Sequence, residues 1–309
     1  MKTNKIHVTE SNYWSFNRQK ELKFVNKFLL FIKEIIESLF KIKISRKISK
    51  INHFEISSFP INLKIINERN VLLTEEIKTF IKPLNFKLND KKIQNLINRH
   101  DYIFYKKNPI KNNSGGIGYN NSIFLYIFNY LINVDLIIES GVWQGYTTYI
   151  FDQQFKKKKK ICFDINFSKL IYKSKKAEYC NYDIKNHKFK KNYNLKNSLA
   201  FFDDHVSQVD RFLFSHNLKI PYMIFDDDIS FLTTHSDGWP SIPTISMIKS
   251  QQRLLNFKWM SLGKIGSAKL NNKIYTNIIN EYLYSQTPYI GRITGYYLQP
   301  PMSFLIKKI

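Results

Sequence analysis

Cysteine is nearly absent from the sequence, which contains only Cys162 and Cys180 among its 309 residues. The spacing of these two residues is neither that of a metal-binding pair nor that of a redox motif, and both lie in apolar stretches. A zinc site or a thiol redox centre is therefore not expected. We expect the two thiols to be small core residues of a protein from a reducing compartment.

A long uninterrupted hydrophobic run is also missing. Residues 1–20 are polar and aromatic, and they lack the apolar centre of a signal peptide. Residues 24–44 are rich in apolar side chains, but six charged lysines and glutamates interrupt them, and a bilayer strongly disfavours such groups. We therefore expect no transmembrane segment and a cytoplasmic location. The apolar residues of 24–44 recur every three or four positions, which predicts a helix that packs on the main domain or, alternatively, lies peripherally on a membrane surface.

Acidic residues are scarce: the sequence contains 24 Asp and Glu but 48 Lys and Arg, which gives a net charge of +24. Such a charge attracts phosphate backbones, so a nucleic-acid partner is one interpretation. However, Lys, Asn and Ile recur along the whole chain, as in proteins from AT-rich genomes, and this bias alone raises the isoelectric point. The basic run 156–160 lies between two apolar elements and is interpreted as a solvated loop. Nucleic acid is therefore the less favoured partner.

The remaining composition supports a folded protein, because 43% of the residues are hydrophobic and 16% are aromatic. The clearest cluster of chain-breaking residues is formed by Pro109 and the Asn- and Gly-rich stretch 112–118. We therefore predict a mostly helical N-terminal region over residues 1–108 and a second domain over residues 109–309.

From residue 121 onward, short apolar stretches alternate with amphipathic ones. Helices are predicted at 122–132, 147–155, 168–176 and 207–215, and strands at 136–139, 160–163, 178–182, 198–202 and 222–225. This alternation predicts an α/β fold with a doubly wound parallel sheet buried on both faces. Residues 292–298 and 302–307 flank two prolines and are predicted to close the sheet as an antiparallel pair.

The most informative stretch runs from residue 136 to residue 148. A buried strand leads into Glu139, then into Gly141 and Gly145 four positions apart, and then into a helix whose N-terminus offers free N–H groups. Glycines permit a tight turn and a close approach to the backbone. Asp164 ends the next strand, where a carboxylate can accept hydrogen bonds from both hydroxyls of a ribose.

The Glu-x-Gly-x-x-x-Gly pattern that begins at Glu139 is similar to the first motif of class I S-adenosylmethionine-dependent methyltransferases. The tighter Gly-x-Gly-x-x-Gly pattern of dinucleotide dehydrogenases is absent from this stretch. The resemblance extends in layout over residues 114–309, and it implies a Rossmann-like methyltransferase sheet with S-adenosyl-L-methionine as cofactor. The cofactor-binding residues that it implies are Glu139, Gly141, Gly145, Thr147 and Asp164. One departure is Trp143, which occupies a position where methyltransferases often have a further glycine.

Two acidic clusters, 203–205 and 226–228, directly follow the last two predicted parallel strands. Crowded carboxylates repel one another unless a cation relieves the repulsion, and hard divalent cations favour such oxygen ligands. The layout looks like that of metal-dependent O-methyltransferases that act on sugars and other small molecules. This resemblance implies Asp203, Asp226 and Asp227 as ligands of Mg²⁺, and Asp203 and His205 as catalytic residues, with His205 as the base. Without a site, Asp204 or His205 would cap the helix near Ser207, and Asp228 would be solvated.

These patterns predict a methyltransferase that acts on the hydroxyl of a sugar or another small molecule. Two alternatives stay open. The basic charge favours an RNA methyltransferase, although no cluster of arginine and aromatic residues supports it. A non-catalytic binding protein with a methyltransferase-like fold is favoured if the side chain of Trp143 fills the cofactor site.

Overall fold

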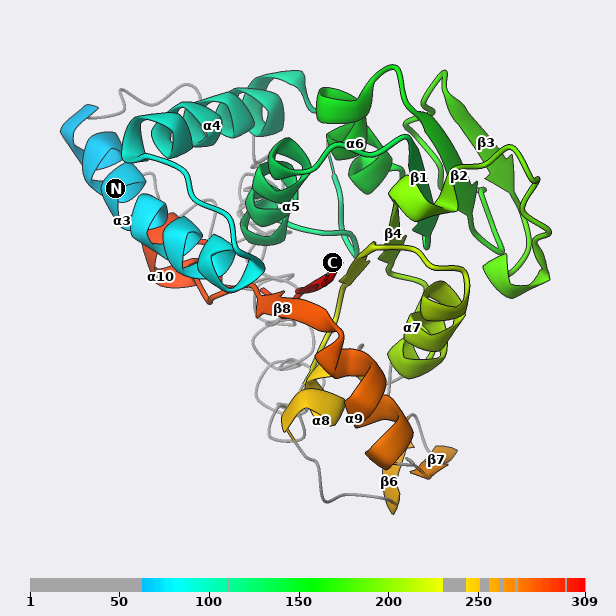
Figure 1. Ribbon diagram of the computed structural model, residues 1–309. Coiled ribbons are helices and arrows are strands. Elements are labelled where there is room, and N and C mark those ends of the chain that lie inside the picture. The colour runs from blue at the N-terminus through cyan, green and yellow to red at the C-terminus, as the bar shows by residue number, and fades with distance from the viewer. Residues whose placement is uncertain are drawn as a thin grey trace, which may run out of the picture.

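The computed structural model describes residues 63–110, 112–229, 243–250, 256–261, 264–269, 272–297 and 299–308 (Figure 1). The helix predicted over 24–44 lies outside these residues. The α-helices are α3 (Leu63–Ile81), α4 (Asp90–Tyr102), α5 (Tyr119–Leu131), α6 (Tyr146–Phe155), α7 (Gln208–Asn217), α8 (Ile245–Ser250), α9 (Asn272–Asn280) and α10 (Gly291–Thr294). The strands are β1 (Leu136–Ser140), β2 (Lys159–Phe163), β3 (Ala177–Cys180), β4 (Ser198–Phe202), β5 (Tyr222–Phe225), β6 (Asn256–Ser261), β7 (Lys264–Lys269), β8 (Tyr282–Gln286) and β9 (Ser303–Lys307).

Seven strands form one sheet in the order β3-β2-β1-β4-β5-β9-β8. The strands β1 to β5 are parallel, whereas β9 pairs antiparallel with both β5 and β8. The strand order reverses beside β1, which pairs with β2 on one side and β4 on the other, and ligands of open α/β sheets bind at such a point. The strand order thus confirms the predicted α/β, Rossmann-like fold.

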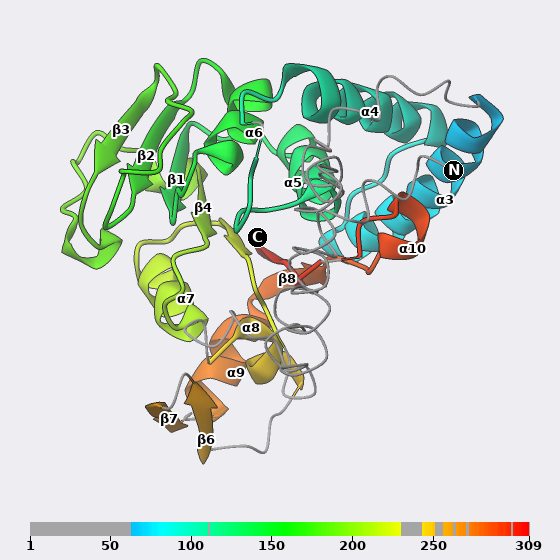
Figure 2. The same cartoon turned by 180° about the vertical axis from the view of Figure 1, so that it is seen from behind.

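Alternate residues of the strands face two separate hydrophobic cores, as expected for a sheet that is covered on both sides. On one face, Ile137, Phe201 and Phe304 pack in the core that α3 to α6 complete. On the other face, Ile138 and Phe202 pack in the core that includes residues of α7 and α8. Figures 1 and 2 show the sheet between these two helical layers.

The helices α3 and α4 lie in the N-terminal region that was predicted to be mostly helical. Asn89 caps α4, because its side chain accepts a hydrogen bond from the backbone N–H of Lys92 at 2.9 Å. Buried residues of both helices, such as Leu73 and Ile97, belong to the same core as the sheet residue Ile137. The proposed domain boundary at residue 108 stays a prediction.

Two predicted elements are wrong. Residues 168–176 form no helix, because this segment runs along the neighbouring turn: the backbone N–H groups of Ile171 and Tyr172 both donate to the carbonyl of Gln144 at 3.0 Å. The predicted strand at 292–298 is also incorrect, since α10 occupies its start and is capped at its C-terminus by Gly295, whose φ is +82°. The antiparallel partner of β9 is the earlier strand β8.

A second sheet consists of the hairpin strands β6 and β7 alone, which lie beyond α9 and away from the large sheet (Figures 1 and 2). Within the described part of the chain, none of the helices is both long enough and apolar enough to cross a bilayer.

Candidate active site

The turn after β1 is shaped by two glycines in the left-handed region of φ. Gly141 and Gly145 both have φ near +88°. A Cβ atom on Gly141 would lie 2.1 Å from the carbonyl oxygen of Asp203, and one on Gly145 would lie 2.4 Å from that of Tyr172. Both glycines are thus required by the protein's own backbone, whether or not a ligand binds at the turn. The absence of a side chain on Gly141 allows the turn to lie in direct contact with the loop that carries Asp203.

Asp164 holds this turn. Its Oδ2 accepts hydrogen bonds from the backbone N–H groups of Val142 and Trp143, at 2.9 and 3.1 Å, and its Oδ1 accepts one from Asn166 at 3.0 Å. A carboxylate offers about four acceptor positions, so about one is left on this partly exposed group. Asp164 can therefore accept hydrogen bonds from both ribose hydroxyls, as predicted, only if the backbone N–H of Val142 or Trp143 shares or gives up its hydrogen bond to this carboxylate.

Trp143, which stands where methyltransferases often have a glycine, has an unusual backbone conformation and contacts a neighbouring loop. Its φ is +49°, which is uncommon for a large side chain. Its indole N–H donates to the carbonyl of Ser114 at 3.0 Å, and the ring lies beside Gly115. The side chain is still 41% exposed. Trp143 thus links the glycine turn to the loop that precedes α5.

Glu139 faces the interior beneath the turn. It is fully buried, and its Oε2 accepts a hydrogen bond from Thr148 at 2.6 Å and a longer one from the thiol of Cys162 at 3.6 Å. Its Oε1 is buried and accepts no hydrogen bond from any described residue. Burial raises the pKa of this carboxyl to about 8, against an ordinary value of 4.5. Thr147 is buried in the first turn of α6.

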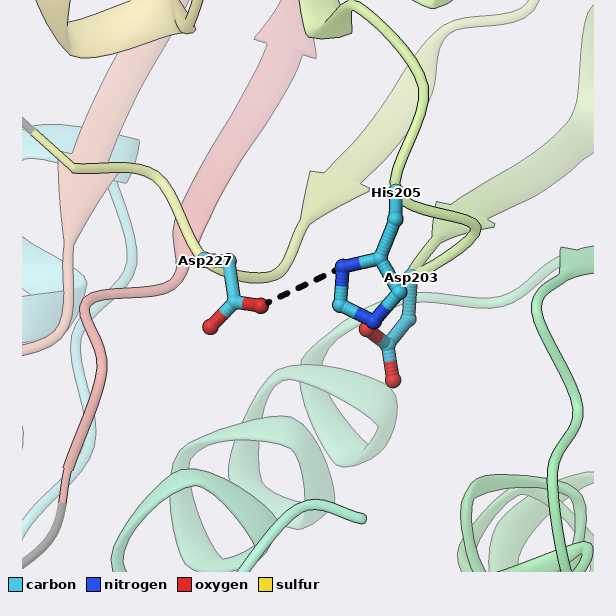
Figure 3. A group of neighbouring side chains, drawn as sticks. All are labelled: Asp203, His205 and Asp227. Atoms are coloured by element: carbon cyan, nitrogen blue, oxygen red, sulfur yellow. Dashed lines mark ion pairs between the residues drawn. The ribbon is translucent and has the colours of Figure 1, made fainter. Parts of the chain in front are cut away.

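The loops after β4 and β5 bring three polar side chains together. Potential ligand atoms of Asp203, His205 and Asp227 all lie within 4.8 Å of one another (Figure 3). The His205 Nδ1 is 3.7 Å from the Asp227 Oδ2, and the His205 side chain is 48% exposed. We call these residues the carboxylate–histidine group. His205 and Asp227 have φ values of +52° and +53°, a backbone strain that often marks functional sites.

The predicted ligand Asp226 is not one of the three residues of this group, although it is their neighbour in sequence. Its Oδ1 accepts a hydrogen bond from the side-chain amide of Asn121 at 3.2 Å. Burial raises the pKa of Asp226 well above its usual range, and the neighbouring Asp227 raises it further. The pKa of Asp203 is raised in the same way by burial and then by Asp226 and Asp227. A bound cation would relieve this repulsion between carboxylates.

The two remaining aspartates of the clusters have structural partners. Asp204 accepts hydrogen bonds from Ser140 at 2.6 Å and from Arg211 at 2.8 Å, whereas Ser207 caps α7. Asp228 is fully buried rather than solvated, and Ser246 donates to it through both its backbone N–H and its hydroxyl. The sequence could not distinguish these two structural aspartates from the candidate metal ligands, because their hydrogen-bond partners lie on other helices and strands.

Two residues near the turn were missed by the sequence analysis. Arg211 is buried within α7 and donates to Asp183 with two nitrogens, each at 2.9 Å, as well as to Asp204. Ile165 directly follows Asp164 and is 84% exposed, which is unusual for a large apolar side chain. The sequence signal for Ile165 was its position at the end of a strand beside the predicted ribose acceptor.

Searches with the sequence match no protein-family model and no curated protein. Solved structures that resemble the chain include an O-methyltransferase of tomaymycin synthesis from Streptomyces achromogenes in complex with SAM, at 8% identity and a TM-score of 0.41, covering 75% of this chain and 96% of that one. An O-methyltransferase from Bacillus cereus in complex with SAH matches at 10% identity and a TM-score of 0.40, over 75% and 100% of the two chains. A SAM-dependent O-methyltransferase from Thermotoga maritima matches at 11% identity and a TM-score of 0.33, over 68% and 71%. Similarity at this level assigns no residue role to this chain, and the fold is assigned from its strand order.

Proposed function

We propose that the protein is an S-adenosylmethionine-dependent methyltransferase that acts on a hydroxyl of a sugar or another small molecule. One observation carries the proposal: the glycine turn touches the carboxylate–histidine group, since the missing Cβ of Gly141 is replaced by the backbone of Asp203. A cofactor bound at the turn and a hydroxyl bound by the group would therefore be neighbours, as methyl transfer requires.

The residues of the turn fit an adenosyl group. Asp164 retains an acceptor position for a ribose hydroxyl, and Ile165 presents an exposed apolar surface to a base. Glu139 is enclosed beneath the turn, so its part in binding would be to support the turn through Thr148. When bound, the cofactor supplies a methyl group activated on a sulfonium.

The carboxylate–histidine group fits a divalent cation. Asp203 and Asp227 would hold the ion, with Mg²⁺ as the predicted metal, because hard cations favour carboxylate oxygens. Asp226 stays the predicted third ligand. His205 is exposed and would take the proton of the substrate hydroxyl, and the nearby carboxylate of Asp227 would stabilise the resulting imidazolium.

The charge of this edge favours a small substrate over RNA. Asp164 is partly exposed at the turn, and the carboxylate of Asp227 lies beside the exposed His205, so both would repel a phosphate backbone. A compact hydroxyl compound meets no such penalty, particularly when a cation neutralises part of the charge.

Calorimetric titration with S-adenosylhomocysteine and with Mn²⁺ or Mg²⁺ tests the proposal. We expect Asp164→Ala to weaken S-adenosylhomocysteine binding by about tenfold or more, because charge-assisted hydrogen bonds are lost. Asp203→Asn and Asp227→Asn should abolish metal binding and activity while cofactor binding persists. Asp210→Asn is a matched control, since Asp210 is an exposed aspartate of α7 that pairs with Lys185.

Absence of S-adenosylhomocysteine binding would contradict the proposal. In that case Trp143→Gly separates the alternatives. If only this variant binds the cofactor, the indole blocks the site and the native protein is a binding protein without methyl transfer. If neither form binds, the turn serves the fold alone.

A further inference from the structure

Nearly half of the protein's net charge of +24 lies in one segment. Residues 156–197 contain fourteen lysines and only three acidic residues, Asp164, Glu178 and Asp183. Residues 63–155, a stretch more than twice as long, contain eleven lysines and arginines against eight acidic residues. A general bias toward lysine would spread the excess along the chain. The concentration in 156–197 therefore calls for a local explanation.

The fold gathers many of these lysines at the amino ends of four parallel strands. In the sheet register, Leu136 of β1 pairs with Lys159 of β2 and with Ser198 of β4. The backbone N–H of Lys160 donates to the carbonyl of Lys176 at 3.0 Å, so the start of β2 also meets the chain just before β3. We define the lysine edge as Lys156, Lys157, Lys158, Lys159, Lys175, Lys176 and Lys196.

The two acidic side chains beside the lysine edge, Asp135 and Glu178, already have partners within the protein. Asp135 accepts hydrogen bonds from Asn194 and Asn197 and forms an ion pair with Lys158 at 3.0 Å. Glu178 lies 3.6 Å from the ammonium group of Lys159. The other five members of the lysine edge are exposed. Most of the positive charge at this edge is therefore uncompensated and accessible.

The geometry of the edge suits an extended polyanion. Four adjacent strands at about 4.8 Å spacing spread the lysines over roughly 14 Å, enough to meet several phosphates. Anionic membranes are less favoured, because none of the exposed large apolar side chains in the described part of the chain lies in the segments that carry the lysine edge, 156–160, 175–177 and 194–197. A membrane-bound surface normally also inserts such side chains.

We propose that the lysine edge binds the phosphate backbone of a nucleic acid. This surface lies at the opposite ends of the strands from the glycine turn, about 13 Å away along β2 at about 3.3 Å per residue. It is therefore separate from the site of methyl transfer, and binding there does not require the proposed enzymatic activity. The contacts are electrostatic and independent of base sequence.

Fluorescence anisotropy of a labelled oligouridine of about 20 nucleotides tests the proposal on the full chain, between about 50 and 200 mM salt. The test variant carries Lys156→Ala, Lys157→Ala, Lys176→Ala and Lys196→Ala. The matched control carries Lys82→Ala, Lys87→Ala, Lys91→Ala and Lys106→Ala. All eight lysines are exposed, and both variants lose the same charge.

We expect the test variant to lose at least about tenfold in affinity at low salt, and the slope of log K against log salt to fall by up to about 3. The control should change by less than about twofold, because its lysines lie on α4 and the neighbouring turns. Equal losses in both variants would overturn the proposal, as would salt-independent or absent binding by the native protein. Tighter binding to phosphatidylserine vesicles than to oligouridine, lost in the test variant, would also overturn it in favour of a membrane surface.

Discussion

The two edges of the large sheet differ in charge, burial and backbone conformation. At the carboxyl ends of the strands, buried aspartates crowd together, and five residues of the connecting loops have positive φ, namely Gly141, Trp143, Gly145, His205 and Asp227. At the amino ends of β1 to β4, the described connections carry exposed lysines and contain no residue with positive φ. Backbone strain and buried carboxylates destabilise a fold, and they are found at the edge where they position chemical groups. The exposed lysines of the other edge change the free energy of unfolding little. Substitutions should therefore affect stability very differently at the two edges.

The largest effect is expected for Arg211→Met, at the carboxyl edge. This substitution leaves the carboxylates of Asp183 and Asp204 without their shared cation, and a broken buried ion pair is strongly destabilising. We expect the free energy of unfolding to fall by about 3 kcal/mol in urea denaturation, the lower end of the usual range because Asp183 is partly exposed. Lys157→Met at the lysine edge is the comparison and should change stability by less than about 0.5 kcal/mol. Similar effects of the two substitutions would remove the contrast between the edges.

A smaller loss is expected for Gly141→Ala. The added methyl group would overlap the backbone of Asp203, and the φ of +88° is unfavourable for alanine. Strain and overpacking together should cost about 2–3 kcal/mol. Gly115→Ala is the matched control, because Gly115 has a similar φ of +81° but its Cβ would lie an ordinary 3.8 Å from the indole of Trp143. Its cost should be about 1 kcal/mol, and equal losses would show that the contact with Asp203 is unimportant.

Expressed per pH unit, the smallest effect is a pH dependence that arises from Glu139. Its pKa is raised from 4.5 to about 8 by burial, so between these pH values the unfolded chain ionises while the folded protein stays protonated. Stability should therefore fall as pH rises from about 5 to 8. Glu139→Gln removes this titration, and we expect its stability relative to the native protein to rise by about 1.4 kcal/mol for each pH unit within that interval. Denaturant unfolding at both pH values measures the difference, and a pH-independent difference would contradict it.

Much of the fold was predictable because its parallel strands are short, continuous apolar runs. The predicted strands at 198–202 and 222–225 match β4 and β5 residue for residue, and the helix at 147–155 differs from α6 by one residue. The segment 168–176 was predicted incorrectly because its conformation depends on contacts with Gln144 and Gly145, which lie far away in sequence. Local periodicity contains no information on such contacts.

The candidate site was predictable in its location but not in its internal arrangement. Aspartates at the ends of successive parallel strands were expected at one edge, and the structure places them there. The pairing of His205 with Asp227, rather than with Asp203 alone, depends on two residues with positive φ in separate loops. Asp228 looked equivalent to its neighbours in sequence, yet it is a buried acceptor for Ser246 and Ser303.

The sequence by itself determined the alternation of strands and helices, the turn at Gly141 and Gly145, and the placement of acidic and basic residues before or after each strand. These features depend on local conformation and on the fact that parallel strands share a direction. Only the tertiary structure decided which carboxylates have an ion-pair or hydrogen-bond partner and which face one another. Those partners come from distant parts of the chain, such as Arg211 for Asp183 and Ser303 for Asp228, and they meet only when the sheet and its covering helices are assembled.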